Sequence, residues 1–298
     1  MKILTYEVEG RKKVGIWNCE ESWIYPLEGF AMEYRNMQEV IEGISDSEIQ
    51  LLNHMAGKDP YEVRGAVPVE QTKILAPIEK PRQDVICLGI NYMAHGEESA
   101  RYKHEDFDGK RPYAIYFSKR VNRCTADKEG IPAYKDMVDS LDYEAELAVI
   151  IGRDARGVSR EEARKYIFGY SVVNDVSARN IQMRHQQWFF GKSLDGFFSM
   201  FPCIVTAEEI EYPPQLGIRS YVNGELRQNS NTGLLIFDID HVISELSRGM
   251  TLKAGTIIAM GTPAGAGMGF EPPKFLKPGD HVCCAIEKIG RIDNPVVE

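Results

Sequence analysis

Short strand-like segments recur along the chain from residue 84 to its end. They span residues 84–89, 113–117, 143–151, 170–174, 217–222, 256–260 and 281–287. One of them is followed directly by Asn223 and Gly224, a pair that is typical of tight hairpin turns. Helical patterns are fewer, and strand and helix do not alternate regularly. The sequence therefore predicts a β-rich α+β fold.

Three segments carry helix signals. Residues 45–48 (Ser-Asp-Ser-Glu) and 159–162 (Ser-Arg-Glu-Glu) have the pattern of a capping box, which marks the start of a helix. We expect the first of these helices to stop at Gly57 and the second at Gly169. Asp238 is placed to cap a third helix that ends at Gly249.

A connector rich in proline and charge separates two regions of different character. Residues 1–72 alternate strand-like pieces with polar helix, and Pro77 and Pro81 flank the charged residues that follow. We therefore predict a small N-terminal α/β domain over residues 1–75 and a larger domain over residues 76–298. A length of 298 residues fits two domains.

Charge and cysteine content exclude several classes of protein. The net charge of -9 repels phosphate backbones, which argues against nucleic acid as a partner. No apolar run approaches the roughly 18 residues of a membrane helix, so no membrane contact is expected. The six cysteines form no Cys-x-x-Cys pair, and we interpret them as reduced core thiols of a cytoplasmic protein.

Two glutamates stand at the start of the longest strand-like run. On a strand, Glu144 and Glu146 point to the same face, about 7 Å apart. Neighbouring carboxylates repel and raise each other's pKa, and a divalent cation would remove the repulsion. A solvated strand face is the more ordinary explanation of this pair when it is taken alone.

A third carboxylate, Asp175, follows the apolar run 170–174 and so lies at the end of a strand, where function concentrates. Three oxygen ligands without His or Cys suit Mg²⁺, with Mn²⁺ and Ca²⁺ as alternatives, rather than zinc. Asp175 is equally well explained as a turn residue or a helix cap before residues 176–179.

His95 and Glu98 form the next candidate pair. If residues 91–98 coil into a helical turn, the two side chains are neighbours at i, i+3. A histidine oriented by a carboxylate is a ready general base. Most such pairs, however, are surface contacts.

Lys192 lies within the aromatic segment 188–193. A lysine amid that much apolar surface either extends its ammonium to solvent or is held for a charged partner.

The segment Gly261–Gly269 is rich in glycine and follows a strand. It lacks the Gly-Lys-Ser/Thr ending of a phosphate loop, so we predict a flexible loop or one that other backbone approaches closely.

Basic residues follow two of the predicted strands: Lys119, Arg120 and Arg123 after one, and Arg179, Arg184 and Lys192 after the other. If both strands line one cavity, that cavity would attract a dianionic substrate. The alternative is that Arg120 and Arg123 face solvent.

Seven motifs, none of them distinctive alone, together resemble the fumarylacetoacetate hydrolase family, and specifically its acylpyruvate hydrolases and hydroxymuconate isomerases. In order they are Asn91-Tyr92-x-x-His95-x-x-Glu98, Asp142-Tyr143-Glu144-x-Glu146, Asn174-Asp175-Val176-Ser177-Ala178-Arg179, Gly191-Lys192-Ser193, Val222-Asn223-Gly224, Gly261-Thr262-Pro263-x-Gly265 and Leu276-Lys277-Pro278-Gly279-Asp280. Their order and approximate spacing match that family over residues 84–294.

The resemblance implies a mixed β-sandwich roll in a homodimer. It also implies roles for ten residues: Mg²⁺ ligands at Glu144, Glu146 and Asp175, a water-activating dyad of His95 and Glu98 on a segment that closes over substrate, charge stabilisation by Lys192, and substrate contacts at Arg179, Gln182, Thr262 and Lys119. Departures from the family pattern near Lys192, such as Asn180 and residues 199–202, leave the identity of the substrate open.

The implied substrates are acylpyruvates and related 2-oxo acids. The cation would act as a Lewis acid, His95 would deprotonate the attacking water, and the enolate charge would fall on the cation and Lys192. We therefore expect a carbon–carbon hydrolase of the fumarylpyruvate and acetylpyruvate class, with a role in aromatic catabolism. One alternative is an isomerase or decarboxylase of a carboxylated hydroxymuconate or 2-oxo diacid at the same site. Another is a metal-dependent binder of small oxo acids that has lost turnover.

Overall fold

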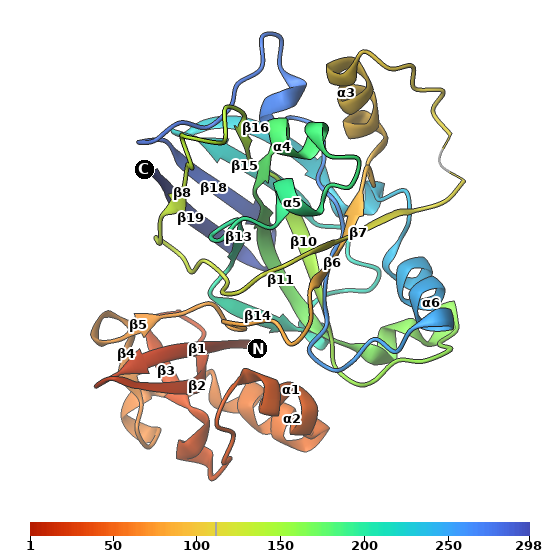
Figure 1. The fold of residues 1–298 in the computed structure, drawn as a ribbon. Helices are drawn as coiled ribbons and strands as arrows, with labels where there is room; N and C mark the ends of the chain where they lie inside the picture. The colour runs from red at the N-terminus through yellow and green to blue at the C-terminus, as the bar shows by residue number, and fades with distance from the viewer. Residues whose placement is uncertain (111) are drawn as a thin grey trace.

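The computed structural model describes residues 1–110 and 112–298. Within them, one large sheet of twelve strands has the order β4-β3-β2-β1-β14-β11-β10-β17-β6-β7, with β13 paired to β11 and β5 paired to β1 (Figure 1). Its strands are β1 Lys2–Val8, β2 Arg11–Trp17, β3 Trp23–Pro26, β4 Val67–Pro68, β5 Lys73–Ile74, β6 Val85–Gly89, β7 Ile115–Lys119, β10 Ala145–Ile151, β11 Ile167–Asp175, β13 Phe198–Met200, β14 Cys203–Thr206 and β17 Ile257–Ala259.

A second sheet of five strands, in the order β16-β15-β18-β19-β8, packs against the first. It is made of β8 Ile131–Pro132, β15 Gly217–Val222, β16 Glu225–Asn231, β18 His281–Ile286 and β19 Gly290–Val297, and a two-stranded sheet joins β9 Leu141–Asp142 to β12 Ser177–Ala178. The α-helices are α1 Met37–Gly43, α2 Asp46–Met55, α3 Met93–Lys103, α4 Arg179–Arg184, α5 Phe189–Lys192 and α6 Ile239–Gly249. The predicted β-rich α+β fold is confirmed.

Strand β10 is buried along its whole length. Leu147, Val149 and Ile151 join the core between the two sheets, whereas Ala148 and Ile150 join a second core that includes side chains of α1 and α2. Because successive side chains of a strand point to opposite faces, a strand with both faces covered must be apolar throughout. This burial explains the unbroken apolar run of residues 147–151.

Two of the three predicted helices are confirmed, and one is wrong. Helix α2 begins with the capping box of Ser45 and Glu48, and Asp238 caps α6 through the backbone N–H of His241. Residues 160–166, in contrast, form a 3-10 helix without a side-chain cap, and Gly169 lies inside β11. A Cβ at Gly169 would come within 2.3 Å of the Val205 oxygen, so this glycine permits close approach of β14 rather than ending a helix.

We predict that Gly169→Ala lowers the free energy of unfolding by about 1–3 kcal/mol, because the added methyl group overpacks the contact with β14. Gly249→Ala is the control, since nothing lies within 4 Å of a Cβ at Gly249. Urea unfolding monitored by circular dichroism measures both. Equal stability of the two variants would contradict this account of Gly169.

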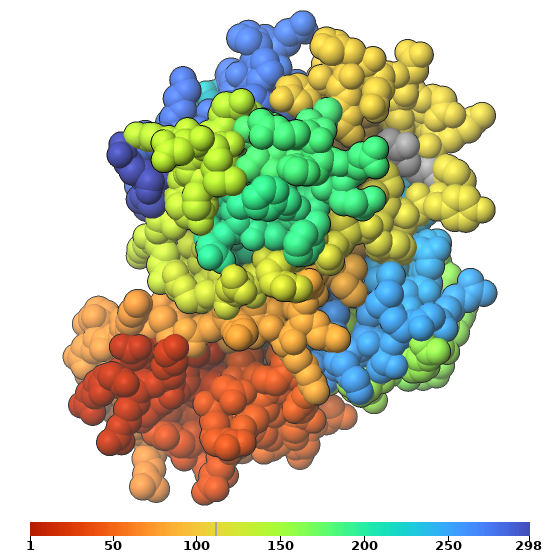
Figure 2. All heavy atoms as spheres, viewed as in Figure 1, coloured from red at the N-terminus to blue at the C-terminus, as the bar shows by residue number. Residues whose placement is uncertain are grey.

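The first 75 residues gather at one end of the molecule (Figure 2). Their sheet is nevertheless continuous with that of the remainder, because β1 pairs antiparallel with β14 through Ile3 and Ile204. The division into two domains at residue 75 stays a prediction.

In the described part of the chain, no helix combines the length and the apolar character needed to cross a bilayer. All six cysteines are free thiols. Five of them are buried as predicted, but Cys19 is exposed and is not a core thiol.

Candidate functional site

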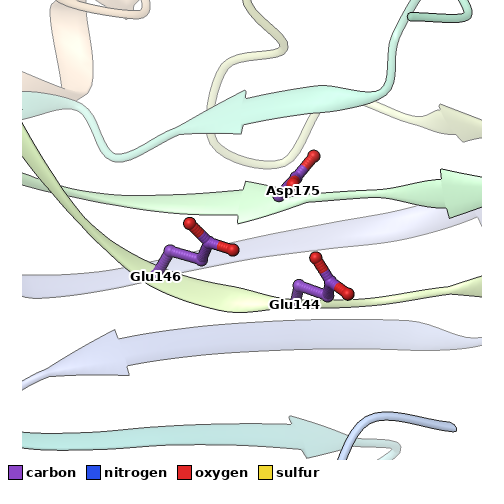
Figure 3. Close-up of side chains that lie close together, drawn as sticks. All are labelled: Glu144, Glu146 and Asp175. Carbon is purple, nitrogen blue, oxygen red and sulfur yellow. The ribbon is translucent and has the colours of Figure 1, made fainter. Parts of the chain in front are cut away.

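The antiparallel pairing of β10 with β11 brings the three predicted metal ligands together. Glu144 immediately precedes β10 and Asp175 ends β11, and the Asp175 N–H donates to the Glu144 carbonyl at 2.9 Å. Glu146, Glu144 and Asp175 each place one carboxylate oxygen within 4.8 Å of the others, and all three are buried. Figure 3 shows them side by side on neighbouring strands. We call them the acidic triad.

Two members of the acidic triad are paired with buried cations. The Lys192 Nζ lies 2.5 Å from the Glu144 Oε2 and 2.7 Å from the Asp175 Oδ2. Lys119 forms a further ion pair with Asp175 and donates to the Val176 carbonyl at 2.7 Å. Asp175 is thus held between two ammonium groups.

Glu146 differs from the other two members because no ion pair to it is found among the described residues. Its Oε2 accepts the backbone N–H of Gly261 at 2.8 Å. Burial, reinforced by the charges of Asp175 and Glu144, raises the pKa of Glu146 well above its ordinary value. Burial also opposes ionisation of Glu144, but Arg179 and Lys192 outweigh it and lower the pKa of Glu144.

The donor set of the triad fits a hard divalent cation. Three carboxylates without a nitrogen or sulfur ligand are the set that Mg²⁺, Mn²⁺ and Ca²⁺ prefer. A cation at this place would also compensate Glu146, whose charge the side chains around it leave unpaired. The structure therefore supports Glu144, Glu146 and Asp175 as the residues that would hold a metal.

Arg179, at the start of α4, is fixed by three side chains. Its Nε donates to Asp142 at 2.9 Å, its Nη1 to Gln182 at 3.0 Å and its Nη2 to Glu144 at 2.6 Å. The sequence pattern includes Asp142 but assigns it no function. Its carboxylate also accepts the N–H groups of Gly267 and Met268, which come from the distant glycine-rich segment and give no signal next to Asp142 in the sequence.

Helix α3 carries the predicted dyad. His95 is buried, and its Nδ1 lies 3.7 Å from the Glu98 Oε2, too far for a hydrogen bond. Among the described residues the Nδ1 has no hydrogen-bond partner. Both Glu98 oxygens lie 3.0 Å from the backbone N of Gly265. The predicted i, i+3 arrangement is present, and its catalytic role stays a prediction.

One pocket joins these groups. Its polar wall contains Glu144, Glu146, Arg179, Gln182, Lys192 and Thr262, the facing helix α3 contributes His95, Ser99, Tyr102 and Lys103, and apolar side chains such as Leu88, Phe117 and Trp188 close the sides. The candidate base and two of the candidate metal ligands, Glu144 and Glu146, therefore line the same pocket.

The predicted basic cavity is only partly present. Arg120 and Arg123 are exposed, pair with Asp84 and Glu129, and do not line the pocket. Lys119 is buried against Asp175 and is also not one of the lining residues, so its contact with substrate stays a prediction.

Comparisons with known proteins give consistent results. The family model for the fumarylacetoacetate hydrolase C-terminal domain matches residues 84–297. The oxaloacetate tautomerase YisK of Bacillus subtilis (strain 168) is 41% identical over 228 residues, which cover 76% of this chain and 74% of the relative. The structure of fumarylacetoacetate hydrolase from Exiguobacterium antarcticum is 36% identical, with a TM-score of 0.83 over 100% of this chain and 99% of that one. The structure of maleylpyruvate hydrolase from Sphingobium sp. SYK-6 in complex with manganese (II) ion and pyruvate is 26% identical, with a TM-score of 0.74 over 100% of this chain and 99% of that one.

Proposed function

Because this chain belongs to the fumarylacetoacetate hydrolase family, we propose that it is an enzyme that converts a small 2-oxo acid in the pocket beneath α3. The relatives include a hydrolase and a tautomerase. The observation that carries the proposal is the pocket itself, which is lined by two members of the acidic triad, by Lys192 and by His95.

We propose Mg²⁺ as the resident cation of the triad, with Mn²⁺ and Ca²⁺ as alternatives. When bound, it supplies a Lewis acid that polarises the 2-oxo group of the substrate. Support comes from the charge balance, since the carboxylates of Asp142 and the triad outnumber the cationic side chains Lys119, Arg179 and Lys192 by one. A divalent ion reverses this excess and makes the site attractive to an anionic substrate.

The reaction that we propose is keto–enol tautomerisation of a 2-oxo dicarboxylic acid such as oxaloacetate. His95 takes the proton from the carbon next to the 2-oxo group, and Glu98 stabilises the imidazolium that forms. Lys192, which lines the same pocket, stabilises the negative charge that develops on the oxygen. The proton then passes from His95 to that oxygen, which yields the enol with no net change of atoms or charge.

We prefer tautomerisation because it needs only a base and a cationic group that stabilises the developing negative charge. His95 and Lys192, which both line the pocket, can supply them. The relative named as an oxaloacetate tautomerase is also more similar to this chain than the maleylpyruvate hydrolase is. Carbon–carbon hydrolysis of acylpyruvates is the second candidate. It is favoured by the pairing of His95 with a carboxylate, which suits activation of water, but it requires an additional bound water.

The test is to add the enol form of oxaloacetate and follow the loss of its ultraviolet absorbance with Mg²⁺ and with chelator. Tautomerisation is expected to be accelerated by Mg²⁺ and to leave the mass of the substrate unchanged. Acetylpyruvate and fumarylpyruvate are assayed in parallel, and release of pyruvate with a free acid would identify a hydrolase instead. Release of carbon dioxide from oxaloacetate would identify a decarboxylase. Binding without turnover of any of them would identify the inactive binder and overturn the enzyme proposal.

We also propose that the protein is a homodimer, as the family resemblance implies, and that it is cytoplasmic. The free cysteines suit a reducing compartment. A role in aromatic catabolism is proposed only with the hydrolase candidate.

A further inference from the structure

One short segment, Gly261–Gly269, donates backbone hydrogen bonds to three carboxylates from different parts of the chain. The N–H of Gly261 donates to Glu146 at 2.8 Å, that of Gly265 to both oxygens of Glu98 at 3.0 Å, that of Gly267 to Asp142 at 2.6 Å and that of Met268 to Asp142 at 3.1 Å. We call this segment the carboxylate-binding loop.

Each of the three carboxylates has a different neighbour in the site. Glu146 belongs to the acidic triad, Asp142 holds the Nε of Arg179 at 2.9 Å, and Glu98 lies 3.7 Å from the Nδ1 of His95. The loop therefore contacts the metal site directly through Glu146, and it is linked to Arg179 through Asp142 and to His95 through Glu98.

We propose that the carboxylate-binding loop is a positioning element that fixes Glu98, and through it His95, relative to the acidic triad. The inference rests on the proposed function, because it explains how the base of that reaction is oriented. In this arrangement, the orientation of the His95 imidazole relative to the triad depends on the hydrogen bond from the Gly265 N–H to the Glu98 carboxylate.

Hydrogen bonds attach the loop to the strand that carries the triad glutamates. The Nε2 of Gln228, which is fully buried, donates to the Thr262 hydroxyl at 2.7 Å and to the Pro263 carbonyl at 2.8 Å. Thr262 in turn donates to the Ala145 carbonyl at 3.0 Å, and the Ala145 N–H donates to Gln228 at 3.0 Å. Since Ala145 separates Glu144 from Glu146, this ring of hydrogen bonds ties the loop to the strand that carries the ligands.

The loop is attached to α3 at two points one helical turn apart. Gly265 binds Glu98, and the carbonyl of Gly269 accepts a hydrogen bond from the Arg101 Nη2 at 3.0 Å. The backbone at Gly265 has a φ of +100°, and a Cβ there would lie 2.0 Å from the Arg227 oxygen, so only glycine fits. The purely structural alternative is that the bond to Glu98 anchors α3 and has no effect on His95.

Gly269→Ala tests the proposal, because the added Cβ would lie 2.5 Å from the Glu98 Cδ and 2.6 Å from each of its oxygens. The φ of Gly269 lies outside the left-handed region, so the backbone accepts alanine. The substitution is expected to displace the Glu98 carboxylate and to lower kcat for the oxaloacetate enol by ~10–100-fold, with Mg²⁺ affinity and KM nearly unchanged. Gly249→Ala is the matched control and should match wild type.

A double-mutant cycle separates positioning from general damage. Glu98→Ala alone should lower kcat as Gly269→Ala does, and Gly269→Ala added to Glu98→Ala should have no further effect, because the obstructed carboxylate is absent. If the two losses multiply, the loop does not act through Glu98 and the proposal is overturned.

Amide hydrogen exchange at Gly265, followed by nuclear magnetic resonance, gives a readout that needs no turnover. The exchange should become faster in both Glu98→Ala and Gly269→Ala and stay as in wild type in Gly249→Ala. Should wild type fail to convert oxaloacetate, the proposed function fails, and this measurement still decides whether the loop holds Glu98. Unchanged exchange in Gly269→Ala would overturn the inference even if turnover were lost.

Discussion

Glu146→Gln is expected to abolish Mg²⁺-dependent turnover while leaving the metal-free protein at least as stable as wild type. The substitution removes one ligand charge from the acidic triad. It leaves no lysine or arginine without an ion-pair partner, because the Glu146 side chain accepts its hydrogen bond from the backbone N–H of Gly261. Isothermal titration with Mg²⁺, kcat for the oxaloacetate enol and the metal-free Tm measure the three effects.

Asp175→Asn and Glu144→Gln are the matched comparisons, because both remove a ligand charge that is also paired with Lys192. Asp175→Asn leaves the buried Lys119 without its carboxylate, which costs about 3–5 kcal/mol, so this variant should lose stability as well as activity. In Glu144→Gln, Lys192 keeps Asp175 and Arg179 keeps Asp142, so its loss of stability should be smaller. Wild-type turnover by a triad variant in chelator would rule out the metal assignment. A loss of stability in Glu146→Gln equal to that in Asp175→Asn would show that Glu146 is compensated after all.

The stability of the metal-free protein should also depend on pH in a defined direction. Because burial raises the pKa of Glu146 above its ordinary value of 4.5, the folded chain keeps a proton that the unfolded chain has released. Stability from this group is greatest below pH 4.5 and declines as the pH rises towards the folded-state pKa. Glu146→Gln lacks this decline, so its advantage in urea midpoint over wild type in chelator should grow with pH.

The parts of the fold that the sequence predicts are those set by local pattern. Residues 147–151 are apolar on both faces, and this part of β10 is buried on both faces. Nothing beyond the periodicity of a strand is needed for that inference. The capping box at Ser45 is likewise complete within four residues. Glu144, Glu146 and Asp175 could be considered together because each lies at the end of a strand-like run, and the family resemblance implies them as ligands. The pairing of β10 with β11, which brings the start of one strand beside the end of the other, is seen only in the structure.

The parts that the sequence does not predict depend on residues far away in the chain. Gly169 looks like a helix end until the oxygen of Val205 is placed against it. Asp142 looks like one more acidic residue until Arg179 and the N–H groups of Gly267 and Met268 converge on it. The residues that adjoin Gly169 and Asp142 in the sequence do not predict these distant contacts.

Neighbouring basic residues also differ in burial and in ion-pair partners, and the composition does not predict this difference. Lys119 ends β7 with its ammonium buried against Asp175, whereas Arg120, one position later, is exposed and pairs with Asp84. Consecutive side chains of an extended chain point to opposite sides, so a cluster in the sequence need not be a cluster in space. The cations that line the pocket include Arg179 and Lys192 instead.

His95→Ala is expected to lower turnover of the oxaloacetate enol by ~10²–10⁴-fold, the usual cost of losing a general base. His95 is not part of the carboxylate cluster that would hold the metal, so the affinity for Mg²⁺ should hardly change. Stopped-flow absorbance gives the rate, and calorimetric titration with Mg²⁺ gives the affinity.

Glu98→Gln tests whether the charge of Glu98 assists His95. The substitution keeps the shape of the side chain and removes the charge that would stabilise a protonated His95. Its turnover should lie between those of wild type and His95→Ala. Loss of Mg²⁺ binding in His95→Ala would make His95 a ligand rather than a base. If His95→Ala keeps full tautomerase activity but loses hydrolysis of acetylpyruvate, then the imidazole serves the water-dependent reaction, and the proton of the 2-oxo acid is moved by another group.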